Sequence, residues 1–315
     1  MNYRIKKIVR FLLKDGVLSR IYRQASILKA KYKMGISDEK FLRQKFLENT
    51  GEILDLDNPV TFNEKLQWLK LHNRNPILTL MADKYRVRKF IKEKSPFDIL
   101  IPIVGGPWTS VEEIDYHTLP EQFVLKCNHD CGSVYICKDK SKFVFDKIKN
   151  EIRRSLNQNY YWVGREWPYK NIKPLIFAEA YMVDESGFEL KDYKFHCFNG
   201  VVKLVHVDFG RHINHRRNIY TPDWHIVPLS IQYPADPLFE IKKPKRLNDM
   251  LKIASRLSQN HKYLRVDLYT KGDKIYFGEL TFYHGGGMEY FSSKFWCREL
   301  GGYIDTNNSD FTQKL

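Results

Sequence analysis

The spacing of apolar positions divides the chain into a helical first part and a β-rich second part. Before residue 95, apolar side chains recur three and four positions apart, which is the period of one face of an α-helix. Thr61 and Glu64 add the Thr-x-x-Glu pattern of a capping box, and Asp83 has the residue type of a second helix cap. The helices predicted in this way cover residues 5–13, 36–49, 62–71 and 84–92.

After residue 100, short runs of β-branched and aromatic residues alternate with turn residues. This pattern predicts strands, and two longer stretches with helical spacing interrupt them at 143–156 and 247–258. The last two strands form a hairpin around a Lys-Gly-Asp turn, and no repeat occurs along the chain. The order of elements predicts the α+β class. The predicted strands cover residues 100–104, 123–127, 134–137, 175–182, 193–198, 201–208, 219–220, 263–269 and 274–282.

Composition is that of an ordinary globular protein and excludes several other classes. The 315 residues are 43% hydrophobic and 28% charged, which is enough apolar material for a sizeable core. No run approaches the ~18 apolar residues of a membrane-spanning helix. Arg10 and Lys14 interrupt the N-terminal apolar stretch, so it lacks the continuous core of a secretory signal. Five cysteines without a CxxC pair indicate reduced thiols in a cytosolic protein and argue against zinc.

The net charge of +15 is concentrated at the N-terminus. Residues 1–33 hold ten basic residues against Asp15, which is +9 of the total. A basic nucleic-acid-binding protein would spread its charge more evenly, so no nucleic-acid partner is predicted. The apolar stripe from Ile5 to Leu13 with basic residues beside it leaves two interpretations open: a helix lying on an anionic membrane surface, or a helix docked on the body of the protein.

The most informative polar constellation lies in the C-terminal hairpin. Arg265 and Asp267 share one face of the first strand, and Glu279 and Thr281 share one face of the second. If the turn centres near residues 271–272, one of two possible registers makes Asp267 and Glu279 diagonal neighbours ~7–8 Å apart. Two carboxylates there can hold Mg²⁺ together with nucleotide phosphates, and the arginine can neutralise a transferring phosphoryl group. A surface strand pair with an Arg–Asp salt bridge is the structural alternative.

A second candidate phosphate site follows the predicted strand 123–127. Lys126 stands at the end of this apolar strand, and a polar loop over residues 128–133, with the single glycine Gly132, leads into the next strand. A lysine at this place can reach a phosphate as a point charge, while the N–H groups of the loop surround the phosphate oxygens. An ordinary hairpin whose lysine reaches toward solvent is the alternative.

Three further matches point to other chemistry but lack its usual context. Asp55 and Asp57 form the DxD pattern of nucleotide-sugar-dependent glycosyltransferases, yet they lie in a helical region. Residues 208–210 spell the kinase motif DFG without the other kinase motifs. The three glycines 285–287 indicate a loop that allows close approach, but they do not identify a ligand.

Taken in order, these segments resemble the ATP-grasp superfamily, and most closely its TupA-like branch, which is named for teichuronopeptide synthesis. The resemblance covers roughly residues 40–295 and is carried by TFNEKLQWLK, VLKCNHDCGS, REWPYKNIKP, AEAYM, DYKFHCFNG and GELTFYHGGGMEYF. It implies two α+β subdomains whose antiparallel sheets enclose ATP. The domains expected from it are a basic helix over 1–35, a helical region over 36–98, and an ATP-grasp domain over 99–315 with subdomains at about 99–172 and 173–300.

The resemblance also implies roles for the matching residues. Lys84 and Lys126 resemble the paired phosphate lysines, and Asp267 and Glu279 match the Mg²⁺ carboxylates. Arg265 resembles the arginine that faces the reacting phosphate, so Arg265 and Lys126 are the expected catalytic residues. Thr281 stands where many relatives have an asparagine as a further metal ligand. The remaining nucleotide-binding positions are Asn128, Gly132 and Ser133 in the loop over the triphosphate, Glu179, Ala180, Tyr181 and Met182 beside adenine, and Asp192 and Lys194 near the ribose.

The chemistry implied by the resemblance is ATP-dependent joining of a carboxylate and an amine through an acylphosphate. The branch is associated with cell-surface polysaccharides such as capsules, so the expected partners are ATP, a uronic-acid-containing glycan or precursor, and an amine or amino acid. The basic segment 1–33 would then hold a cytoplasmic enzyme peripherally at the inner membrane face. The alternatives are a phosphotransferase on the same fold, a glycosyltransferase, and a non-catalytic, basic surface-binding protein.

Overall fold

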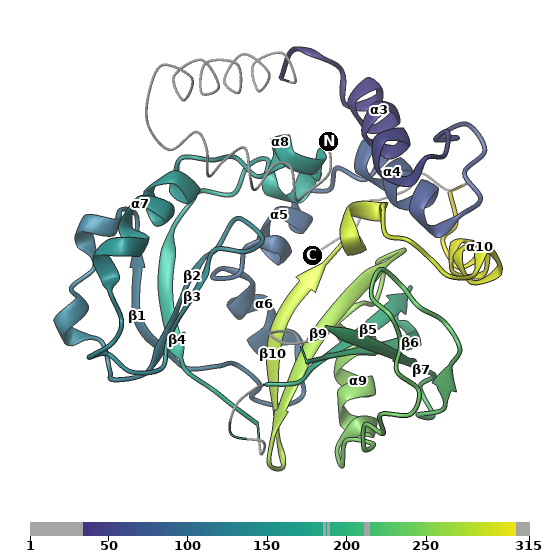
Figure 1. Cartoon of the computed structure of the whole chain (residues 1–315). Coiled ribbons are helices and arrows are strands. Elements are labelled where there is room, and N and C mark those ends of the chain that lie inside the picture. The colour runs from purple at the N-terminus through teal and green to yellow at the C-terminus, as the bar shows by residue number, and fades with distance from the viewer. Residues whose placement is uncertain (1–33, 185–186, 188–189, 211–214, 307–315) are drawn as a thin grey trace.

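Two antiparallel sheets and the helices around them make up the structure, a computed structural model (Figure 1). It describes residues 34–184, 187, 190–210 and 215–306. The basic segment 1–33 therefore lies outside the described residues, and the prediction made for it stays a prediction. Within the described ranges, no helix combines the length and the apolar character needed to cross a membrane.

Helices open the described chain, as the apolar spacing predicts. Helix α4 starts with the predicted capping box: the Thr61 hydroxyl accepts the Glu64 N–H, and the Glu64 carboxylate accepts the Thr61 N–H at 2.8 Å. Helix α6 begins at Val87, later than the predicted residue 84, because Asp83 Oδ1 instead accepts the N–H groups of Tyr85 and Arg86 in the turn before it. The four helices are α3 (Asp38–Thr50), α4 (Phe62–His72), α5 (Ile77–Ala82) and α6 (Val87–Lys94).

The strands form two separate sheets with different neighbours. The four-stranded sheet has the order β1-β4-β2-β3, and the six-stranded sheet has the order β10-β9-β5-β6-β7-β8. The first contains β1 (Ile103–Trp108), β2 (Phe123–Cys127), β3 (Val134–Cys137) and β4 (Ile176–Ala180). The second contains β5 (Asp192–Phe198), β6 (Val201–Phe209), β7 (Arg216–Tyr220), β8 (Ile226–Val227), β9 (Leu264–Lys271) and β10 (Lys274–Thr281). This arrangement confirms the predicted α+β class.

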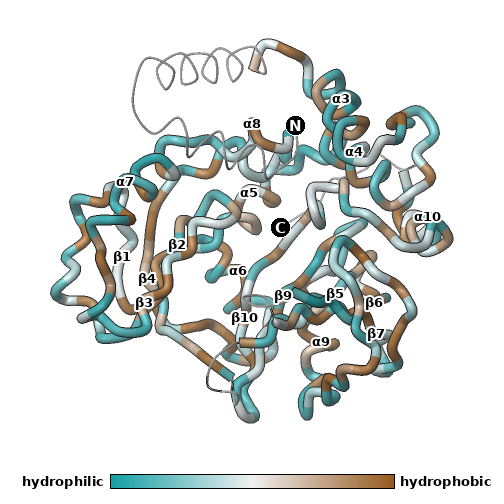
Figure 2. Tube along the Cα trace, in the orientation of Figure 1, coloured by the Kyte–Doolittle hydropathy of each residue, from teal (hydrophilic) through white to brown (hydrophobic). Residues whose placement is uncertain are grey.

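The remaining helices lie around the two sheets (Figure 1). Helix α7 packs beside β2, while α9 packs on β5, β6 and β9. In Figure 2, strands β2 and β4 are largely hydrophobic, whereas α7 is largely hydrophilic. The helices after α6 are α7 (Phe145–Leu156), α8 (Tyr161–Gly164), α9 (Leu247–Leu257) and α10 (Lys294–Gly302), and the 3-10 turns are η1 (Val111–Glu113), η2 (Tyr116–Thr118), η3 (Trp167–Tyr169) and η4 (His284–Gly287).

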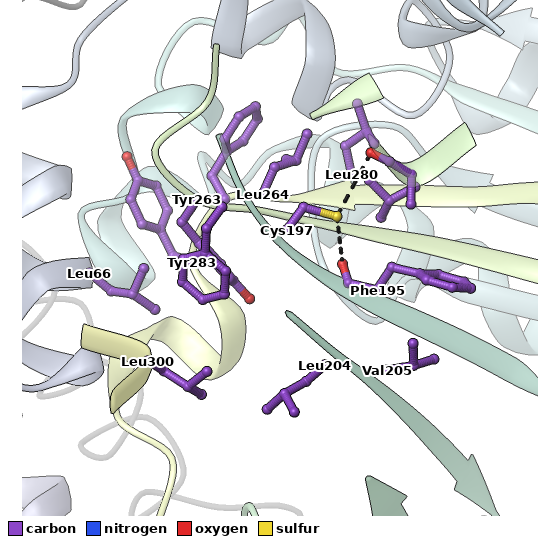
Figure 3. Close-up of a cluster of buried hydrophobic side chains, with 14 of the residues drawn as sticks. Leu66, Phe195, Cys197, Leu204, Val205, Tyr263, Leu264, Leu280, Tyr283 and Leu300 are labelled. Atoms are coloured by element: carbon purple, nitrogen blue, oxygen red, sulfur yellow. Dashed lines mark hydrogen bonds between the residues drawn. The ribbon is translucent and has the colours of Figure 1, made fainter. Parts of the chain in front are cut away.

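Each sheet has its own hydrophobic core. The smaller core lies between the four-stranded sheet, η1 and α7. The larger core contains the six-stranded sheet together with side chains from α3 to α6, α9 and α10. Figure 3 shows part of it, where Leu66 of α4 and Leu300 of α10 lie near Tyr263 of the segment before β9 and Leu204 of β6. The helical N-terminal part therefore shares its core with the larger sheet.

The register of the C-terminal hairpin differs from the prediction. The turn centres on residues 272–273, and a bulge at Gly278 shifts the pairing, so that Glu279 lies directly opposite Asp267 instead of diagonal to it. The spacing prediction assumed a regular ladder and could not place the bulge. Glycine permits it, because a Cβ at Gly278 would lie 3.0 Å from the Tyr269 ring. The two carboxylates are therefore closer than predicted, since directly opposed residues have Cβ atoms ~4.5–5.5 Å apart.

Candidate active site

A cavity of about 380 Å³ lies between the two sheets. Its walls come from β2, β3 and β4 on one side and from β9 and β10 on the other. Apolar residues such as Val124, Ile136 and Leu190 line it together with a few charged side chains, which is the usual composition of a small-molecule site. The predicted site residues on its wall are Lys84, Lys126, Glu179, Ala180, Tyr181, Met182 and Glu279.

The wall on the four-stranded sheet carries a carboxylate held between two cations. Glu179 on β4 lies diagonal to Lys126 on β2, because Val124 is the direct partner of Glu179 in the ladder. Lys126 Nζ is 2.6 Å from Glu179 Oε2, and Arg88 Nη1 is 3.1 Å from Glu179 Oε1. A phosphate bound in this cavity could therefore replace Glu179 as the ion-pair partner of Lys126.

Lys84, which lines the cavity, is hydrogen-bonded to the polar loop after β2. Lys84 Nζ donates to the carbonyl of Asp130, and its backbone N–H donates to the Asn128 carbonyl at 3.1 Å. Asn128 is fully buried: its side chain donates to Asp83 Oδ2 at 2.9 Å and accepts the Leu175 N–H at 2.8 Å. The structure thus places Asn128 beneath the loop as its anchor.

The other loop residues differ in what they offer a phosphate. Gly132 is exposed, has φ near +109°, and has no atom within 4 Å of the place where a Cβ would stand. Ser133 is tied inward, since its hydroxyl contacts Asp130 and Ser155. His129 is a hydrogen-bonding residue of the loop, with Nε2 2.9 Å from the Ser155 carbonyl.

On the six-stranded sheet, five charged side chains form one cluster below the cavity. Arg265 on β9 donates to both oxygens of Asp267 at 2.7 Å and to Glu279 Oε1 at 2.9 Å. Lys194 on β5 lies opposite Asp267 in the ladder; its ammonium is 2.7 Å from Asp267 Oδ2 and also contacts Asp192. Lys84 is a third base acting on Glu279, so the three acids are balanced by three bases, which makes the burial of the cluster possible.

Glu279 is the member of the cluster that reaches the cavity. Its side chain is 34% exposed, whereas that of Asp267 is 1% exposed. Burial raises the pKa of Glu279, but Lys84, Arg265 and Lys194 together outweigh it and lower that pKa to about 2. Thr281 donates to Glu279 Oε1 at 3.2 Å. Glu279 is therefore ionised at neutral pH, with Oε2 facing no partner in the described part of the chain.

This donor set fits a hard divalent cation. Carboxylate oxygens are the ligands that Mg²⁺ prefers, and Glu279 Oε2 is the oxygen that remains available. Asp267 stands directly opposite it in the ladder, but Arg265 and Lys194 already donate three hydrogen bonds to its oxygens. Asp267 thus holds the side chains of Arg265 and Lys194 in place, whereas Glu279 has an oxygen that could bind a metal ion.

The sequence of this chain matches the model of a known protein family. The sequence model of the family described as TupA-like ATPgrasp matches residues 64–305, well over half of the chain. The chain belongs to this family. The match confirms the family and the fold that the sequence motifs predict. Among curated proteins, no sequence matched this one.

Solved structures similar to this TupA-like ATP-grasp protein are distant in sequence. D-alanine–D-alanine ligase from Bacillus anthracis, complexed with ATP, is 16% identical over 65% of this chain and 55% of its own, with a TM-score of 0.36. L-amino acid ligase from Bacillus licheniformis is 15% identical over 79% of this chain and 55% of its own, with a TM-score of 0.42. The ATP-grasp ligase PsnB, complexed with Mg and ADP, is 11% identical over 77% of this chain and 65% of its own, with a TM-score of 0.37. This chain thus spans between half and two thirds of the length of these structures.

Sequence reasoning missed a buried histidine cluster behind Arg265 in this ATP-grasp protein. His196 on β5, His206 on β6 and His284 on η4 bring one ring nitrogen each within 4.8 Å of one another. His196 Nε2 lies 2.8 Å from His206 Nδ1, and its Nδ1 lies 2.9 Å from the Tyr263 hydroxyl. The only signal in the sequence was the position of His284 beside the glycines 285–287.

Proposed function

We propose that this TupA-like ATP-grasp protein is an ATP-dependent carboxylate–amine ligase. The observation that carries the proposal is the cavity between the sheets, which brings Lys84 and Lys126 together with Glu279 and, through Glu279, with Arg265. Two lysines, a buried arginine and a free carboxylate oxygen are what phosphoryl transfer from a metal-bound nucleotide requires.

The lining of the cavity supports ATP as the nucleotide. Val124, Ile136 and Leu190 provide an apolar slot for a flat base, and the segment after β4 brings the backbone of Tyr181 and Met182 to its edge. Lys84 and Lys126 would hold the phosphates, with the N–H groups of the loop at Gly132 nearby. Glu279, with Asp267 opposite it, would hold Mg²⁺, which supplies charge neutralisation to the phosphates.

The reaction that we propose has two steps. A carboxylate oxygen of the first substrate attacks the γ-phosphorus of ATP, the bond to the ADP oxygen breaks, and an acylphosphate forms. The nitrogen of an amine then attacks the acyl carbon, phosphate leaves with the carboxylate oxygen, and the amine loses a proton. The protein contributes position and positive charge, from Lys84, Lys126 and Arg265, and needs no covalent nucleophile.

The substrates that we propose are a uronic-acid-containing glycan or its precursor and an amino acid or other amine. The support is the resemblance to a branch named for teichuronopeptide synthesis. We also propose a cytoplasmic enzyme that associates peripherally with an anionic membrane, supported by the five free cysteines and by the charge of residues 1–33.

A coupled screen tests the proposal. ADP and inorganic phosphate are measured while Mg²⁺, ATP, uronic acids and amino acids are supplied together and singly. We expect both products to appear in equal amounts only when an acid and an amine are both present. The matched controls are Glu279→Gln, which should lose turnover, and Glu93→Gln, whose side chain is exposed on α6. ADP together with a phosphorylated acid and no free phosphate would indicate a phosphotransferase. If no pair of acid and amine gives ADP, both the ligase and the phosphotransferase are refuted.

A further inference from the structure

Arg265 has five N–H donors, and contacts in the described part of the chain account for four of them. Nε donates to Asp267, and Nη2 donates to Asp267 and Glu279. Nη1 lies 2.8 Å from His284 Nδ1. Each terminal guanidinium nitrogen carries two hydrogens, so one N–H of Nη1 is left without an acceptor among these residues.

The contact with Arg265 fixes the tautomer of His284. Arginine stays protonated in proteins, so Nη1 donates and Nδ1 of His284 must accept. The proton of the neutral imidazole then sits on Nε2, which lies 2.8 Å from Glu289 Oε2, although this N–H is not aligned for a hydrogen bond. Glu289 is in turn 3.1 Å from Arg217 Nη1.

The loop that carries His284 is tied to helix α4. Gln67 donates to the carbonyls of Gly286 and Gly287 at 2.9 and 2.7 Å, and Lys70 donates to that of Gly286 at 2.8 Å. A Cβ at Gly287 would lie 2.4 Å from the Gln67 amide nitrogen, so only glycine allows this approach. His284, which is 2% exposed, is therefore held in a fixed place beside Arg265.

We infer that His284 is a positioning residue for phosphoryl transfer. Its Nδ1 accepts a hydrogen bond from one N–H of Arg265 Nη1 and leaves the second N–H of Nη1 free to donate to the transferring phosphoryl group. The inference rests on the proposed function, since it needs Arg265 to face the reacting phosphate. Asp267 already fixes the plane of the guanidinium through two hydrogen bonds. His284 adds an acceptor at the nitrogen that Asp267 and Glu279 do not reach.

The same geometry argues against a metal ion among the three histidines. Nδ1 of His284 accepts a hydrogen bond from the Arg265 guanidinium, and the rings of His196 and His206 are hydrogen-bonded to each other. Arg217 approaches from the other side, through Asp208 and Glu289. A further cation between two arginines would be repelled by both.

Two variants of His284 test the inference. His284→Leu removes the acceptor, whereas His284→Asn offers an amide oxygen at the same number of bonds from the backbone as Nδ1. For the leucine variant we expect kcat for ADP release to fall by about 10–100-fold while KM for ATP changes by less than about 3-fold, as for loss of a residue that orients another. The asparagine variant should recover most of the rate. His261→Leu, which removes a buried histidine outside the cluster, is the matched control and should keep the wild-type kcat.

Each outcome decides the inference. Wild-type kcat in His284→Leu, or an asparagine variant as slow as the leucine variant, would overturn it while the proposed function stands. If the wild-type protein releases no ADP with any substrate pair, the proposed function fails instead. Histidine-selective ¹⁵N NMR tests the hydrogen bond from Arg265 to His284 without turnover. A proton on Nε2 alone supports this hydrogen bond, and a proton on Nδ1 excludes it and overturns the inference.

Discussion

Replacing Glu279 by glutamine should destabilise the free protein as well as remove a cation ligand. The variant keeps the shape of the side chain but removes one of the three acids that balance Arg265, Lys194 and the nearby Lys84. In many metal sites, loss of an acid relieves repulsion and stabilises the unliganded protein. Here the acids are already paired with cations, so the variant leaves an excess positive charge in a mostly buried cluster.

The size of the effect follows from the pKa of Glu279. Burial opposes ionisation, but Lys84, Arg265 and Lys194 outweigh it and lower this pKa from 4.5 to about 2. At 1.36 kcal/mol per pH unit, this amounts to about 3 kcal/mol of stabilisation of the carboxylate. The side chain is 34% exposed, so solvent screening reduces the value to roughly 1–2 kcal/mol.

Urea unfolding of the wild-type protein and Glu279→Gln, without nucleotide or metal, measures this difference. Because the pKa is lower in the folded state, the stabilisation is complete above pH 4.5 and is lost as the pH falls toward 2. We expect the free energy of unfolding of the variant to be lower by roughly 1–2 kcal/mol at pH 7. This difference between the two proteins should become smaller below pH 4.5. If the variant is as stable as the wild-type protein at pH 7, or more stable, the inference that Glu279 balances the charge of the surrounding cations is wrong. Glu93→Gln controls for the substitution itself.

Three further predictions concern the cavity, the core and the N-terminus. Lys126→Met should weaken calorimetric binding of a Mg²⁺-bound non-hydrolysable ATP analogue by about 10-fold, or 1.4 kcal/mol, and unchanged affinity would exclude Lys126 from the phosphate site. Gly301→Ala should lower stability by about 1–3 kcal/mol, because a Cβ there would lie 2.2 Å from the Val60 carbonyl oxygen, whereas Gly302→Ala, with nothing within 4 Å, should be nearly neutral in a melting curve. The full chain should sediment with anionic vesicles at low salt and be released as salt rises, and a chain without residues 1–33 should not; an unstable truncated protein without vesicle binding by the full chain would favour a docked helix.

Local signals in the sequence were enough to predict most elements. The capping box at Thr61 and the bounds of β2 and β3 agree with the structure, because caps and alternating apolar runs depend on neighbouring residues. Helix α5 was missed, since its six residues, ILTLMA, form an apolar run too short to show a helical period. The family motifs identified both walls of the cavity, Lys126 on one and Glu279 on the other.

Features that depend on contacts between distant segments could not be predicted. The bulge at Gly278 places Glu279 opposite Asp267, and it arises from the fit of the glycine against the Tyr269 ring. The contact of His284 with Arg265 joins a loop to a strand, and nothing in the spacing of either segment indicates it. Such contacts follow from the packing of the sheet and not from any period in the sequence.

The fate of one oxygen atom distinguishes ligation through an acylphosphate from the other reactions. An acid substrate that supports ADP release is labelled with ¹⁸O in its carboxylate, and the reaction is run with Mg²⁺, ATP and the amine. If the carboxylate attacks the γ-phosphorus and phosphate later leaves with that oxygen, each released phosphate carries one ¹⁸O and the product is the amide of the acid and the amine. Unlabelled phosphate, or label found only in a phosphorylated acid, would contradict ligation through an acylphosphate.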